Sequence, residues 1–127
     1  MKRAHAAYSA TPASHAHERQ DCAVRAIRVA CDVPYRHAHT LCAVAGRRDK
    51  HRISRRSLEM VMSNLPVQRV LGVYKITLTA FLKVFTEGRY VVHRRDHLFV
   101  VIDGTVHDWK YTGTGARSRV TDAWRVL

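Results

Sequence analysis

The spacing of apolar residues divides the chain into a helical part and a later part with the pattern of strands. In four segments, apolar positions recur every three or four residues, the period of a helix with one buried face. A capping residue or a proline marks the start of three of them, since Asp21, Pro34 and Thr77 or Thr79 suit a first turn. The sequence therefore predicts helices over residues 22–31, 34–45, 58–65 and 78–85.

The pattern changes near residue 89, where short β-branched and aromatic runs alternate with turn residues. Strands are predicted over 90–92, 97–102 and 105–111, and a further short strand over 67–73. Asp103 and Gly104 form a two-residue turn typical of a β-hairpin. Helices followed by an antiparallel sheet indicate an α+β domain.

The N-terminal segment follows neither period. Residues 1–19 are rich in Ala, His and Ser, and Pro12 interrupts them, so we expect a flexible arm. The rest of the chain shows no internal repeat and no linker. We therefore expect one domain over residues 20–127.

Composition narrows the class of protein. The apolar share of 46% is that of a globular chain, and no apolar run approaches the roughly 20 residues that cross a bilayer. The N-terminus lacks the apolar stretch of a secretory signal, and three cysteines cannot all pair with one another. These features predict a protein of the cytosol with reduced thiols and no membrane partner.

The chain is strongly basic, with 22 Lys and Arg against 10 Asp and Glu and a net charge of +12. Such a balance favours acidic or phosphate-rich partners. Basic residues concentrate between the second and third predicted helices, where they could contact phosphates or an acidic protein, or form a solvated loop. They are Arg47, Arg48, Lys50, Arg52, Arg55 and Arg56.

Cys22 is the candidate nucleophile, because it falls in the first turn of the first predicted helix. Unpaired N–H groups and the positive end of the helix dipole stabilise a thiolate there, and the same N–H groups can bind an oxyanion. The neighbouring carboxylate of Asp21 opposes ionisation unless its charge is taken up. A buried structural cysteine remains the alternative, as we expect for Cys31 and Cys42 on the inner helix faces.

A base for this thiol is offered by His97 on the predicted hairpin. With Asp103 and Gly104 as the turn, Asp108 lies diagonal to His97 on the same face, about 7–8 Å away between α-carbons. Asp103 lies six residues along the strand, roughly 20 Å from His97, and cannot orient its ring. Asp108 is therefore the predicted orienting acid, with a solvated carboxylate as the alternative.

The histidines and cysteines do not predict a metal site. Residues two apart on a helix, such as His37 and His39, do not share a face, and the cysteines form no CxxC pair. We therefore expect neither a metal nor another cofactor.

Three segments carry a resemblance to a known family. They are QDCAVRA from Gln20, DHLFVVIDG from Asp96 and VHD from Val106. They resemble small phage and bacterial proteins of the papain-like cysteine peptidase superfamily, akin to its bacteriocin-processing branch. The resemblance implies N-terminal helices packed on a C-terminal antiparallel sheet, with Cys22 as nucleophile, His97 as base and Asp108 as orienting residue. The superfamily usually places an oxyanion-hole Gln several residues before the Cys, whereas the nearby amide here is Gln20, two positions away.

Two functions follow as hypotheses. The first is a cysteine hydrolase, expected to be a peptidase that cleaves an amide or isopeptide bond; transglutaminase and acyltransferase chemistry use the same constellation. The second is a catalytically inactive papain-like module, a basic phage structural or host-interacting protein that binds nucleic acid or an acidic protein. In either case we expect a cytoplasmic protein, in the cytoplasm of a bacterial host if the chain is phage-encoded, with association with a virion as the alternative.

Overall fold

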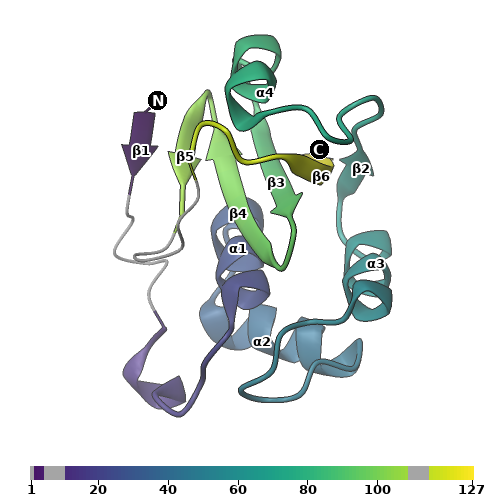
Figure 1. Ribbon diagram of the computed structural model, residues 1–127. Coiled ribbons are helices and arrows are strands. Elements are labelled where there is room, and N and C mark those ends of the chain that lie inside the picture. The colour runs from purple at the N-terminus through teal and green to yellow at the C-terminus, as the bar shows by residue number, and fades with distance from the viewer. Residues whose placement is uncertain (1, 5–10, 109–114) are drawn as a thin grey trace.

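The computed structural model describes residues 2–4, 11–108 and 115–127, and within them the fold is α+β (Figure 1). The helices are α1 (Cys22–Cys31), α2 (Tyr35–Val44), α3 (Arg55–Ser63) and α4 (Leu78–Val84), preceded by a 3-10 turn, η2 (Ala13–His15). The strands are β1 (Lys2–Ala4), β2 (Val67–Arg69), β3 (Arg89–Arg94), β4 (His97–Ile102), β5 (Thr105–His107) and β6 (Val120–Val126). They form one sheet in the order β1-β5-β4-β3-β6-β2, antiparallel except for β1, which runs parallel to β5. The predicted α+β class is confirmed.

Two of the helices, α3 and α4, begin at a residue whose side chain caps the first turn. Thr77 caps α4, because its side chain accepts a hydrogen bond from the N–H of Ala80 at 3.1 Å. Ser54 caps α3 in the same way through the N–H of Ser57. This cap was missed in the sequence, so α3 begins three residues earlier than predicted and includes Arg55 and Arg56.

The hairpin of β4 and β5 has the predicted register. Ile102 pairs with Thr105, and Val100 with His107. The two turn residues, Asp103 and Gly104, have φ values of 47° and 79°, and left-handed backbone at both positions matches the twist of a two-residue hairpin. The strand ends at His107, and the predicted continuation over 109–111 lies outside the described residues.

Strand β6 was not predicted, although it is an interior strand of the sheet, between β3 and the edge strand β2. Two adjacent residues of β6, Ala123 and Trp124, are both buried, at 0% and 2% exposure, because their side chains enter different cores on opposite faces of the sheet. A strand that is covered on both faces loses the alternation of apolar and polar residues by which a half-exposed strand is identified.

Two hydrophobic cores cover the two faces of the sheet. Helices α1, α2 and α3 pack on one face through residues such as Ile27 and Leu58, against Leu98, Val100 and Trp124 of the sheet. Helix α4 covers the other face, where its apolar side chains meet those of β3, β4, β5 and β6. Helix α1 packs directly on β4. This packing holds the start of α1 next to the sheet.

Parts of the predicted N-terminal arm contact the domain. Strand β1 pairs with β5, and Ala4 lies opposite His107. Glu18 is buried, and its carboxylate accepts hydrogen bonds from both terminal nitrogens of Arg47, at 2.7 and 3.1 Å. The flexibility of residues 1–19 and the domain boundary at residue 20 stay predictions. In the part of the chain that the structure describes, no helix has both the length and the apolar character needed to cross a membrane.

Candidate active site

Cys22 is the first residue of α1, as predicted, and is partly exposed. The first hydrogen bond that closes the helix runs from the N–H of Arg25 to the carbonyl of Asp21, at 3.0 Å. The N–H groups from Cys22 to Val24 therefore have no acceptor within the helix. The thiol stands at the positive end of the helix, beside donors that an oxyanion could use.

The carboxylate of Asp21 does not cap the helix that it precedes. It accepts hydrogen bonds from the hydroxyls of Thr11 and Tyr35, each at 2.6 Å, and pairs with Arg25 at 3.1 Å. Burial raises the pKa of Asp21, but the hydroxyl groups and Arg25 outweigh burial and leave it below its ordinary value. The charge that would oppose a thiolate at Cys22 is thus taken up by three donors, and the helix N–H groups remain uncapped by Asp21.

His97 and Asp108 form the predicted contact. His97 Nε2 lies 2.7 Å from Asp108 Oδ1, and the two residues are 8% and 2% exposed. Asp108 is therefore not the solvated carboxylate of the alternative interpretation. The ring of His97 also stacks on that of Phe99, with 6.0 Å between centroids, which restricts its rotation.

The same imidazole interacts with the side chain of Cys22, which contributes to raising the pKa of the ring. Because Nε2 faces Asp108, Nδ1 is the nitrogen left for the thiol. Burial lowers the pKa of His97, but the hydrogen bonds and charges of Asp108 and Cys22 outweigh it and raise the pKa to about 9. The ring is therefore held as an imidazolium at neutral pH, the partner that a thiolate needs.

The other two cysteines have no such environment. Cys42 is fully buried, and burial raises its pKa to about 12. Burial also raises the pKa of Cys31, on the partly buried end of α1. Both belong to or pack against the hydrophobic core, as predicted.

No described contact joins Gln20 to Cys22, His97 or Asp108. Its backbone has a φ of 51°, and its side chain is exposed. The oxyanion-hole role of Gln20 stays a prediction, and the N–H groups at the start of α1 supply donors that do not depend on it.

The prediction that Arg47 contacts phosphates or an acidic partner is wrong. Its side chain is 1% exposed and forms a bidentate ion pair with Glu18, so it cannot contact phosphates or a partner protein. This ion pair could not be predicted from the pattern of residues, because the acid lies 29 positions earlier in the predicted arm. Arg55 is exposed but paired with Asp122 and Glu59. The exposed basic residues of the segment also include Arg48, Lys50, Arg52 and Arg56.

Glu18 also belongs to the group whose ligand atoms could hold a metal. His17, Glu18 and Asp49 have such atoms within 4.8 Å of one another. However, the Glu18 carboxylate already accepts hydrogen bonds from Arg47, from the N–H of Lys50 at 2.7 Å and from His39 at 2.6 Å. Its oxygens are occupied by donors, so we interpret the group as an ion-pair network that fixes the segment leading to Cys22.

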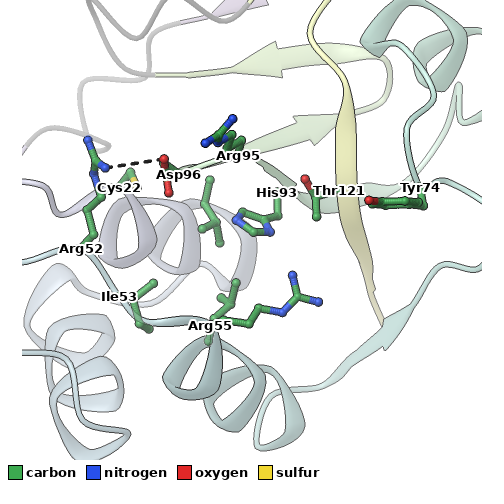
Figure 2. A pocket seen from close by; sticks show the side chains of 11 residues that line it. Cys22, Arg52, Ile53, Arg55, Tyr74, His93, Arg95, Asp96 and Thr121 are labelled. Atoms are coloured by element: carbon green, nitrogen blue, oxygen red, sulfur yellow. Dashed lines mark ion pairs between the residues drawn. The ribbon is translucent and has the colours of Figure 1, made fainter.

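A pocket of about 350 Å³ opens beside Cys22 (Figure 2). It lies between the loop before α3, the start of α1, the β3–β4 turn and the loop at residue 74. Its described lining consists of Cys22, Arg52, Ile53, Arg55, Leu58, Tyr74, His93, Arg95, Asp96, Leu98 and Thr121. Sequence reasoning missed Tyr74, His93, Arg95 and Thr121 as site residues, because they come from separate elements without a shared motif.

Comparison with known proteins adds nothing to this geometry: no family model matches the chain, and neither a curated protein nor a solved structure matches it significantly. The fold is α+β, and the site combines Cys22, at the start of a helix that packs on the sheet, with His97 on β4 and its partner Asp108. The finer assignment rests on these residues alone.

Proposed function

We propose that the protein is a papain-like cysteine hydrolase that cleaves an amide or isopeptide bond in a peptide or protein substrate. The observation that carries the proposal is the 2.7 Å contact of His97 Nε2 with Asp108 Oδ1, together with the interaction of the same ring with Cys22. The three residues come from the start of α1, from β4 and from the position after β5. The chain order, with the thiol on the first helix, the imidazole on a strand and the acid just after the next strand, supports the papain-like assignment.

The chemistry follows from the placement of these groups. The Cys22 thiolate attacks the substrate carbonyl carbon, and the N–H groups at the start of α1 donate hydrogen bonds to the oxyanion. The His97 imidazolium gives its proton to the leaving amine, which departs and leaves a thioester on Cys22. His97 then takes a proton from water, whose oxygen attacks the thioester and releases the acid and the thiolate. Asp108 keeps the imidazole in the orientation that both steps need.

Selective thiol labelling tests the proposal. The purified chain is treated with iodoacetamide at pH 7, and each cysteine is followed by peptide mass spectrometry. We expect Cys22 to react at least about tenfold faster than Cys31 and Cys42, because only the thiolate is the nucleophile. His97→Ala should abolish this advantage, whereas His51→Ala, an exposed histidine, should preserve it. Equal slow labelling of all three thiols would contradict the proposal.

The acceptor of the acyl group distinguishes hydrolysis from transfer. Reaction of a tagged peptide mixture in ¹⁸O-labelled water should place one heavy oxygen in each new carboxyl group, and Cys22→Ser should form no such product. A product in which an added primary amine, rather than water, ends on the acyl group would assign a transglutaminase or acyltransferase instead.

The exposed part of the basic segment favours a second candidate, the inactive module that binds nucleic acid or an acidic protein. Arg48, Lys50 and Arg56 are exposed, on a chain of net charge +12. Such binding should weaken steeply with salt and should persist in Cys22→Ser. If this binding is found without selective labelling of Cys22, the module replaces the hydrolase.

A further inference from the structure

The pocket beside Cys22 carries unequal charge at its rim. Arg52, from the loop before α3, and Arg95, from the β3–β4 turn, flank Asp96 in Figure 2. Asp96 is the acidic residue among the described lining residues. Its carboxylate lies 3.8 Å from Arg52 Nη1, a long contact between two side chains that are 59% and 63% exposed.

The other basic lining residues do not add to this charge. Arg55 is paired with Asp122 at 2.5 Å and with Glu59 at 3.1 Å, so its guanidinium is already neutralised. Burial lowers the pKa of His93 despite its contact with Asp122, which favours the neutral ring at pH 7. Arg95 is exposed and makes no ion pair with any carboxylate of the described residues. The rim therefore carries two guanidinium groups and one carboxylate.

One wall of the pocket is apolar, whereas Tyr74, His93 and Thr121 contribute polar groups elsewhere in the lining. Leu58 and Leu98 are 1% and 2% exposed, and Ile53 packs against the same core. Together these side chains form a wall that can take methylene groups but offers no partner to a polar atom. A ligand group that suits both parts has a short apolar stem and an anionic end.

We propose that this pocket binds an acidic side chain of the substrate, close to the scissile bond, with glutamate as the best fit. The methylene groups of the glutamate lie along Ile53 and Leu98, and its carboxylate meets Arg52 and Arg95. This inference rests on the proposed hydrolase function, since it uses Cys22 as the point of cleavage. A phosphate backbone fits less well, because it has no apolar stem to fill the lower part of the pocket.

Activity-based probes test the inference without a known substrate. Acetylated tripeptide vinyl sulfones carry Glu, Gln or Lys at either of the two residues before the electrophile, and the rate constant for labelling of Cys22 is measured by mass spectrometry. At one of the two positions, Glu should react about tenfold faster than Gln, the scale of one charge-assisted contact in a partly exposed site, and Lys should be slowest. The preference should shrink as salt is added.

Variants assign the preference to the pocket. Arg52→Gln and Arg95→Gln should each reduce the ratio of Glu to Gln rates, whereas Arg56→Gln, a nearby exposed arginine outside the lining, should leave it unchanged. Asp96→Asn should increase the ratio, because it removes the opposing charge, and Asn tolerates the φ of 59° at this position.

The outcomes separate this inference from the proposed function. If Cys22 is labelled selectively by iodoacetamide but the Glu, Gln and Lys probes react at equal rates, the acidic-substrate inference is overturned and the hydrolase stands. If Cys22 shows no selective labelling by any reagent, both fail. If a single-stranded oligonucleotide blocks all three probes equally and Arg95→Gln relieves the block, the pocket binds phosphate and the inference is overturned.

Discussion

Replacing Asp108 by Asn would test whether this acid holds the charge of His97. Asn has nearly the shape of Asp, and its amide oxygen can still accept a hydrogen bond from His97 Nε2, so the buried geometry is kept. What is lost is the negative charge, 2.7 Å from the ring in the wild-type chain.

The size of the effect follows from the titration of His97. The pKa of about 9, against an ordinary value of 6.5, corresponds to about 3 kcal/mol between the two protonation states. Hydrogen bonds and charges of Asp108 and Cys22 provide this against the opposing effect of burial. Because burial opposes the two partners, their combined effect exceeds the net shift, and if each supplies about half, the pKa of His97 in Asp108→Asn should fall by more than one unit, to below about 8.

The measurement is NMR titration of the His97 ring, assigned by comparison with His97→Gln. The matched control is Asp103→Asn, which changes an exposed acid on the turn of the same hairpin and leaves an oxygen for the N–H of Gly88. We expect a midpoint near pH 9 in the wild type and in this control, and a midpoint more than about one pH unit lower in Asp108→Asn. A wild-type midpoint near 6.5, or the same midpoint in Asp108→Asn, would refute the reasoning.

Further predictions concern stability. Glu18→Gln should lower the free energy of unfolding in urea by about 3–5 kcal/mol, because it leaves the buried guanidinium of Arg47 without its charge partner. The control Glu87→Gln, at an exposed position, should change this free energy by less than about 0.5 kcal/mol. Equal effects of the two substitutions would contradict the prediction. The pKa values of Glu18 and Asp21 are lowered in the fold, so their stabilisation is present above their unfolded values and lost as pH falls below them. The melting temperature should therefore drop on acidification, less steeply in Glu18→Gln; a parallel drop would argue against it. Because the pKa of His97 is raised to about 9, the contribution of His97 to the free energy of unfolding is complete below pH 6.5 and is lost as pH rises through 9. Urea titrations between pH 6 and 10 measure this loss, and a constant free energy of unfolding over that range would exclude it. Tyr35→Phe removes a hydroxyl donor from buried Asp21 and should cost about 1–3 kcal/mol, and an unchanged urea midpoint would exclude that role.

Local patterns were sufficient for much of the fold. The start of α1 at Cys22 and the β4–β5 register were predictable, because a helix start and a two-residue turn are determined by a few neighbouring residues. Once the turn was placed at Asp103 and Gly104, the period of two along a strand put Asp108 on the face of His97. The contact between these two side chains was therefore a short-range inference, and it is confirmed.

Long-range partners were not predictable in the same way. The ion pair of Glu18 with Arg47 joins a segment without periodicity to one that has only charge, and neither pattern specifies the other. Asp21 raised a real question in the sequence, and its answer depends on Thr11 and Tyr35, whose hydroxyls approach it only in the folded chain. Burial on both faces likewise removed the periodic signal of β6.

The position of β6 between β3 and β2 has a consequence for folding during synthesis. During synthesis, β3 and β4 leave the ribosome well before residues 120–126, and until those residues arrive β3 has one open edge and β2 has no partner. Unpaired strand edges invite pairing with other chains. We therefore expect a nascent chain that stops before β6 to bind chaperones or to aggregate, whereas in the chain that includes β6 this strand pairs with both β3 and β2.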